Sequence, residues 1–83
     1  MWAIAFDLNS AIAKTNKLYR KIFKKLSGFG FKKEQYSVYT SNDGINRLHE
    51  AVNAISAIPY LKAAVRKFNV FRIEEGSDFK NSL

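Results

Sequence analysis

Apolar residues at the start of the chain form a short run that predicts a buried strand. Trp2, Ile4 and Phe6 are aromatic or branched, and the run ends at the acidic Asp7. Nearly continuous apolar runs of this length are typical of strands at the centre of a sheet. We therefore expect a strand over residues 1–8 that carries a carboxylate at its end.

The next apolar residues recur at helical spacing and predict one helix from about residue 10 to residue 27. Asn9 or Ser10 can cap its start, and Gly28 and Gly30 are expected to end it. Its apolar face is expected to consist of Ile12, Tyr19, Ile22, Phe23 and Leu26.

The other face of this predicted helix carries a stripe of lysines, because Lys14, Lys17, Lys21 and Lys24 are spaced three, four and three residues apart. With Lys32 and Lys33 just beyond the helix, such a stripe can follow a phosphate backbone. The alternative is that it is only a solvated helix face, and the sequence leaves both open.

The middle of the chain predicts extended structure followed by a second helix. Residues 31–40 form either two short strands or one strand kinked around Tyr36, and residues 41–44 form a turn. A second amphipathic helix then ends at Pro59, and its apolar face consists of Ile45, Leu48, Val52 and Ile55.

The last elements are a shorter helical stretch over residues 60–67 and a strand over residues 70–74. The predicted order is strand, helix, strand pair, helix and strand. This is the split βαβ layout of an α+β domain, in which two helices cover one face of an antiparallel sheet. We expect one domain over residues 1–83, and a partner on the uncovered face.

Charge and composition narrow the function classes. The net charge of +7 and the pI near 9.9 favour polyanionic partners, and the absence of cysteine excludes disulfide frameworks and thiolate chemistry. Asp7 interrupts what would be the apolar core of a signal peptide, and no apolar run approaches about 18 residues. We therefore expect a cytoplasmic protein with no membrane partner.

Five short blocks of the sequence are distinctive together, and they are residues 2–8, 30–31, 35–39, 64–66 and 77–79. In this order and at these separations they resemble the virulence-associated protein D (VapD) family, and the similarity covers nearly the whole chain. The first two blocks also resemble the small ferredoxin-like nuclease subunit of CRISPR systems, in which a strand ends in an aspartate and a Q-x-S-V motif follows.

This resemblance implies a ferredoxin-like homodimer that packs through its sheet face or edge. It also implies an endoribonuclease that cleaves single-stranded RNA, including mRNA, as the toxin of a toxin–antitoxin pair with a protein antitoxin. One block departs from the family pattern V-R-D-I-R-A-F, because Lys67 replaces an acid and Asn69 replaces an arginine. If that acid serves catalysis or dimer contacts, this chain has altered the function.

Asp7 is the first candidate for the chemistry, since a carboxylate that closes an apolar strand must be exposed, paired or bound to metal. The alternative is a cap for the first helix. Two Asp7 side chains from a dimer can share a hydrated Mg²⁺, or Asp7 can act as base on the RNA 2′-hydroxyl. Ser37, in the Q-x-S-V motif, can bond a phosphate or Asp7, although strand serines more often bond the backbone.

Other residues are candidates for binding RNA. Arg66 and Arg72 can contact phosphate or join a dimer, and Asp78 can serve either purpose. Tyr36 and Tyr39 can stack on bases or simply pack. His49 has no chemical partner in the sequence and flanks the second helix.

Two alternatives to the enzyme remain. The chain can be a catalytically silent ferredoxin-like module that binds RNA or DNA, or an interaction subunit whose sheet face assembles with other proteins. Asp7 separates the three hypotheses, because only the enzyme needs its carboxylate.

Overall fold

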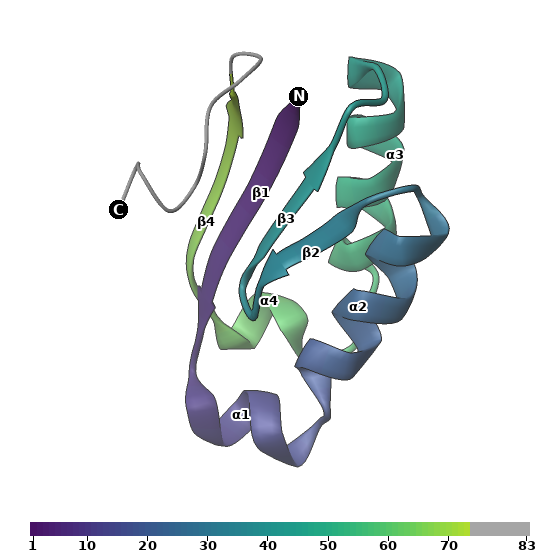
Figure 1. Cartoon of the computed structure of the whole chain (residues 1–83). Helices are drawn as coiled ribbons and strands as arrows, with labels where there is room; N and C mark the ends of the chain where they lie inside the picture. The colour runs from purple at the N-terminus through teal and green to yellow at the C-terminus, as the bar shows by residue number, and fades with distance from the viewer. Residues whose placement is uncertain (74–83) are drawn as a thin grey trace.

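The computed structural model describes residues 1–73, in which helices pack on one face of a four-stranded sheet (Figure 1). No helix within these residues is long and apolar enough to cross a membrane. The elements in chain order are β1 (Trp2–Leu8), α1 (Ser10–Thr15), α2 (Leu18–Gly28), β2 (Lys32–Gln35), β3 (Val38–Ser41), α3 (Ile45–Ser56), α4 (Leu61–Ala64) and β4 (Val65–Arg72).

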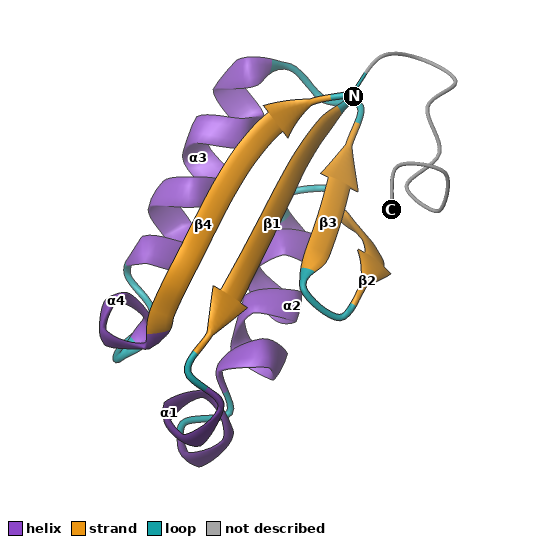
Figure 2. Cartoon of the chain, turned by 90° about the vertical axis from the view of Figure 1, so that its left-hand side faces the viewer, coloured by secondary structure: helices purple, strands orange, loops and turns teal. Residues whose placement is uncertain are grey.

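The sheet has the strand order β2-β3-β1-β4, and each neighbouring pair is antiparallel. Figure 2 shows α2 and α3 behind this sheet, so that its other face is uncovered within the described residues. The α+β, ferredoxin-like split βαβ arrangement predicted from the sequence is therefore confirmed.

The hydrophobic core lies between β1 and the helix layer. Ile4, Phe6 and Leu8 alternate along β1 and all belong to the buried cluster, as side chains two residues apart on a strand share a face. Each fully buried side chain of this kind contributes roughly 1.5–3 kcal/mol of transfer free energy. Their partners from the helices and β3 include Leu18, Ile22, Leu26, Tyr39, Leu48, Ala51 and Ile55.

The first helix differs from the prediction, because the chain breaks it at Asn16 and Lys17 into α1 and α2. Lys17 has a left-handed backbone conformation with φ of 53°. The Asn16 side chain donates from Nδ2 to the Ile12 carbonyl at 3.0 Å, and the Asn16 backbone N–H donates to the same oxygen at 3.1 Å. The prediction of one helix over residues 10–27 is wrong because this local cap ends the first two turns.

The end of the described chain also differs from the prediction. β4 begins at Val65 rather than at residue 70, and the helical stretch is reduced to Leu61–Ala64. The cause is pairing with β1, which runs from Trp2 opposite Arg72 to Leu8 opposite Val65. The tertiary ladder outweighs the weak helical pattern there. The final residue predicted for this strand, at position 74, lies outside the described residues.

Residues 31–40 contribute two strands with a turn at Tyr36 and Ser37. Of the two alternatives left open by the sequence, two short strands are therefore correct and one kinked strand is not. Two predicted core residues are exposed instead. Phe23 is 44% exposed and Ile45 is 50% exposed, and the Lys33 ammonium lies 5.8 Å from the Phe23 ring.

Tyr60 offers a test of the backbone geometry, because it precedes α4 with φ of 70° while its side chain is 64% exposed. A left-handed conformation is costly for residues with a Cβ, so Tyr60→Gly should raise the free energy of unfolding by about 0.5–1 kcal/mol. Urea denaturation measures the change. Tyr60→Ala is the control, since it removes the ring but keeps the strained backbone. Equal stability of the two variants would contradict the strain.

Candidate active site

Asp7 lies near the end of β1 on the uncovered face of the sheet. Its strand neighbours Phe6 and Leu8 point into the core, whereas Asp7 is exposed. It does not cap the following helix, because the Asn9 side chain accepts the Ile12 N–H at 3.1 Å. Asn9, and not Asp7, therefore caps α1, and the carboxylate of Asp7 is available to solvent and ligands.

Two basic residues of β4 lie beside Asp7. Lys67 is its direct cross-strand partner, and the register then shifts so that Leu8 pairs with Val65. The shift leaves Arg66 as the extra residue of a β-bulge, a feature that commonly re-aims side chains next to functional sites. Both Lys67 and Arg66 are exposed. Of the two residues that depart from the family pattern, Lys67 faces Asp7 and Asn69 pairs with Ala5.

The hairpin turn between β2 and β3 borders the same strand end. The Ser37 carbonyl accepts the Phe6 N–H at 3.1 Å, next to the Ala5–Val38 pair of the ladder. Ser37 is half-buried, and Tyr36 before it is 63% exposed. The structure therefore brings Ser37 and Tyr36 next to Asp7. The contact that positions Ser37 is made by its backbone, and a catalytic role for its hydroxyl stays a prediction.

A pocket of about 520 Å³ opens beside this turn, at the break between α1 and α2. The Tyr19 and Tyr36 ring centroids lie 4.4 Å apart, and the Lys33 ammonium lies 4.9 Å from the Tyr36 ring. Cations therefore surround an exposed aromatic face, which is the combination that binds unpaired bases and their phosphates. The pocket is lined by Ser10, Ala13, Lys14, Lys17, Tyr19, Arg20 and Tyr36.

The charge of Asp7 reaches this pocket. Burial, then Tyr36 and then Asp7 raise the pKa of the Tyr19 phenol above its ordinary value. The phenol is therefore protonated at neutral pH and keeps its hydrogen as a donor. Burial, followed by Tyr36, likewise raises the pKa of Tyr39. Asp7 thus lies near enough to the pocket to influence Tyr19, although it is not one of the residues that line the pocket.

The predicted lysine stripe is divided, because the break at Lys17 changes the direction of the chain. Lys14 and Lys17 line the pocket near Tyr36, whereas Lys21 and Lys24 line a different hollow beside α3. The prediction of one continuous basic face is therefore wrong.

Sequence reasoning missed two residues of the pocket. Tyr19 was predicted on the apolar face of the first helix and does pack against the core, with its ring centroid 6.1 Å from that of Phe6, but its place in the pocket was not predicted. Arg20 fell outside the lysine spacing. Their only signal in the sequence is Asn16, whose helix-ending preference marks the break that turns them into the pocket.

The remaining candidates lie elsewhere. Tyr39 is buried in the core, which confirms the packing alternative, and His49 is exposed on α3 in the helix layer. Arg72 pairs with Trp2, at the opposite end of the ladder from Asp7. Asp78 lies outside the described residues. None of the first three shares the site around Asp7.

The donor set around Asp7 does not fit a divalent metal within one chain. Residues 1–73 hold no group of three or more histidine, cysteine or acidic side chains that could bind a metal ion. Mg²⁺ prefers carboxylate oxygens, whereas the residue across the ladder from Asp7 is the ammonium of Lys67. A metal here would need a second carboxylate from another copy of the chain.

The sequence of this chain is similar to those of known proteins. The family model described as CRISPR associated protein Cas2 matches residues 1–80. A curated protein named endoribonuclease VapD, from Dichelobacter nodosus, is 40% identical, over 95% of this chain and 92% of its own length. An endoribonuclease VapD homolog from Neisseria gonorrhoeae is 38% identical, over 95% and 94%. An endoribonuclease VapD from Helicobacter pylori is 36% identical, also over 95% and 94%. The resemblance noted in the sequence is confirmed.

The proximity of Asp7 and Tyr19 can be tested by titration. Asp7→Asn removes a negative charge, so the pKa of Tyr19 should fall, yet stay above its ordinary value because burial is the larger cause. NMR of ring-labelled tyrosine against pH measures the change. Asp43→Asn, in the turn before α3, is the control and should leave Tyr19 unaltered. An unchanged Tyr19 pKa in Asp7→Asn would contradict the proximity.

Proposed function

Because the chain belongs to the CRISPR associated protein Cas2 family, and within it to the VapD proteins, we propose that it is an endoribonuclease that cleaves single-stranded RNA, including mRNA. The main support for this proposal is the position of Asp7. It is exposed at the open face of the sheet, between basic residues of β4 and the pocket of cations and aromatic rings. The relatives' printed names supply the reaction class, and the geometry of this site supports it.

The chemistry that suits the site is attack by the RNA's own 2′-hydroxyl. Asp7 takes the hydroxyl proton, and the resulting oxygen bonds the adjacent phosphorus while the bond to the 5′-oxygen breaks. The products are a cyclic phosphate and a 5′-hydroxyl, whose proton comes from water. Lys67 and Arg66, exposed beside Asp7, offset the charge that gathers on the phosphoryl oxygens.

The pocket supplies the preference for unpaired RNA. Tyr36 is exposed, with the Tyr19 ring 4.4 Å away and the Lys33 ammonium 4.9 Å from its ring. An unpaired base that displaces this ammonium can stack on Tyr36. Lys14, Lys17 and Arg20 line the same pocket and can neutralise the neighbouring phosphates. Stacking and phosphate contacts do not depend on the RNA sequence. This part of the site therefore distinguishes single-stranded from double-stranded RNA, and it does not distinguish one base from another.

We further propose that the chain acts as a homodimer. Support comes from the uncovered sheet face and from β4, an edge strand of the described sheet on which Val70 is 39% exposed. The expectation of Mg²⁺ shared by two Asp7 side chains stays a prediction that requires such a dimer. Lys67 lies opposite Asp7, which favours the alternative in which cationic side chains offset the charge on the phosphate. We therefore propose a metal-independent reaction.

The central test incubates single-stranded RNA with the unmodified protein and with Asp7→Asn, each with and without EDTA. We expect cleavage by the unmodified protein in both conditions, because Lys67 and Arg66 supply the charge. Asp7→Asn should lower the rate at least about a hundredfold, since it loses the base. Gel electrophoresis of end-labelled RNA measures cleavage, and the cyclic phosphate is identified by mass spectrometry.

Asp43→Asn is the matched control for this test, and it should cleave normally. Asp7→Asn should keep its RNA affinity and its oligomeric state, which anisotropy and analytical ultracentrifugation measure. Cleavage that survives Asp7→Asn would overturn the mechanism. Loss of cleavage in EDTA, restored by Mg²⁺, would favour the shared metal instead.

We also propose that the chain is the toxin of a toxin–antitoxin pair, and that it acts in the cytoplasm with a protein antitoxin. This proposal rests on the family resemblance alone. The same variants test it, because induced expression of the unmodified chain should then stop growth whereas Asp7→Asn should not. Normal growth with the unmodified, cleaving protein would contradict it.

RNA binding by the pocket can be tested separately in the Asp7→Asn background. Tyr36→Leu removes the stacking face but keeps apolar bulk, and it should weaken single-stranded RNA binding about tenfold by anisotropy. Tyr60→Leu is the matched control, because Tyr60 is 64% exposed against 63% for Tyr36 and does not line the pocket. Equal affinity of the two variants would contradict the stacking role.

One observation favours a second function. Lys67 opposite Asp7 is the departure from the family pattern, and a silent RNA-binding module would tolerate it best. That module predicts salt-dependent RNA binding without cleavage by the unmodified protein. The cleavage test above therefore separates the two functions.

A further inference from the structure

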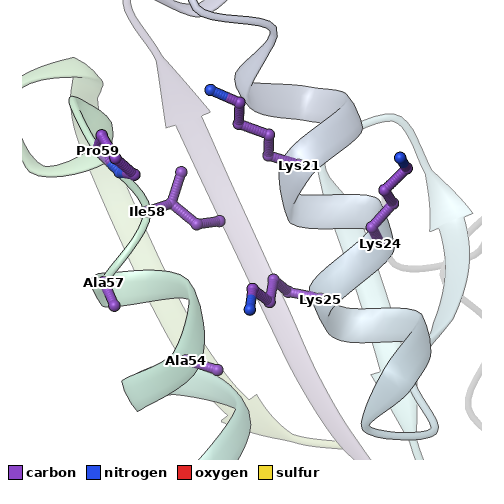
Figure 3. A pocket seen from close by; sticks show the side chains of 7 residues that line it. All are labelled: Lys21, Lys24, Lys25, Ala54, Ala57, Ile58 and Pro59. Atoms are coloured by element: carbon purple, nitrogen blue, oxygen red, sulfur yellow. The ribbon is translucent and has the colours of Figure 1, made fainter.

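A second basic hollow lies in the helix layer, on the other side of the sheet from Asp7. It has a volume of about 340 Å³ and opens between α2 and the segment that links α3 to α4 (Figure 3). We call it the α2–α3 hollow. It is lined by Lys21, Lys24, Lys25, Ala54, Ala57, Ile58 and Pro59.

The charge of the α2–α3 hollow has one sign. Lys21, Lys24 and Lys25 are exposed on α2, and among residues 1–73 no acidic residue lines the hollow. Within residues 1–73 the salt bridge found joins Arg47 to Glu50 at 3.2 Å, so it uses none of these lysines. Clustered like charges repel one another, and they are most stable when an anion is bound among them.

The opposite wall of the hollow is aliphatic. Ala54, Ala57 and Pro59 form one side, and Ile58, which is only 6% exposed, projects between the helices in Figure 3. An occupant must therefore offer an apolar group as well as negative charge. Volumes of about 300–1,000 Å³ are typical of sites that bury such a group.

The α2–α3 hollow lacks the feature that favours RNA in the pocket beside Asp7. That pocket has the rings of Tyr19 and Tyr36, whereas none of the described residues that line the α2–α3 hollow is aromatic. Single-stranded nucleic acids rely on aromatic faces for their bases. An aliphatic wall is better matched by the side chain of a protein, and the lysine rim by its carboxylates.

We propose that the α2–α3 hollow is a docking site for an acidic segment of a partner protein. The segment places a leucine-like side chain against Ile58 and Ala57, and its carboxylates pair with Lys21, Lys24 and Lys25. The inference is independent of the proposed ribonuclease activity, because the hollow contains none of the residues around Asp7. A bound segment also leaves the open sheet face clear.

The probe is a short fluorescein-labelled peptide of glutamates with leucines at helical spacing, measured by anisotropy against the unmodified protein. Lys25→Glu, whose side chain lies toward the gap between the helices in Figure 3, should weaken its binding about tenfold. Lys62→Glu is the matched control, because it reverses an exposed lysine on α4 outside the hollow. It should bind the peptide as the unmodified protein does.

A second variant separates the apolar wall from the charge. Ala57→Phe leaves all three lysines but fills the hollow from an exposed position, so folding is preserved while peptide binding falls about tenfold. A twin peptide with serine for every leucine should also bind about tenfold more weakly.

Three outcomes would overturn the proposal. One is equal peptide binding by Lys25→Glu and Lys62→Glu, and another is equal binding of the two peptides. The third is that unlabelled single-stranded RNA displaces the peptide and binds more weakly to Ala57→Phe, which would make the occupant a nucleic acid. Cleavage assays play no part in this test, so its failure is distinct from failure of the proposed function.

Discussion

The alternation of side chains along β1 is the constraint on which the rest of the structure depends. Ile4, Phe6 and Leu8 must face the helices to close the core, so Asp7 between them must face the open side of the sheet. A slip of one residue would bury the carboxylate and expose three core side chains. The position of Asp7 is therefore held by the same hydrophobic burial that stabilises the fold.

The second controlling feature is the left-handed backbone at Lys17. A straight helix would have carried four lysines along one side. The break instead turns Lys14, Lys17 and Arg20 toward the aromatic pair, while Lys21, Lys24 and Lys25 border the aliphatic wall of α3. Two basic surfaces arise from one sequence pattern, and their different walls suit different partners.

The surroundings of Asp7 are cationic, which bears on how the site can work. Lys67 faces it across the ladder, and the bulge leaves Arg66 beside it. Positive groups supplied by the protein compete with a divalent cation for the same carboxylate, and they also stabilise a phosphate brought close to it. The departure at Lys67 from the family pattern therefore lies directly at the site, and the departure at Asn69 lies opposite Ala5 on the same pair of strands.

Much of the fold follows from local patterns in the sequence, because periodicity and turn residues act over short distances. They were sufficient for β1, for the end of α2 at Gly28 and for α3, whereas they left open whether residues 31–40 form two strands or one kinked strand. The prominence of Asp7 was also evident, since an acid that closes an apolar strand is costly unless it is exposed or paired. Family resemblance added the reaction class, and the comparisons support it.

Tertiary structure decided what depends on residues far apart in the chain. The ladder with β1 extended β4 back to Val65 and brought Lys67 opposite Asp7, a register that no local pattern encodes. The cap by Asn16 outweighed the helical periodicity around it, and beyond the break Arg20 and Tyr19 line the pocket while Tyr19 still packs against the core. Sequence alone thus singled out Asp7 as a candidate, and packing selected its neighbours, because cross-strand and helix-end contacts form only when the whole sheet is assembled.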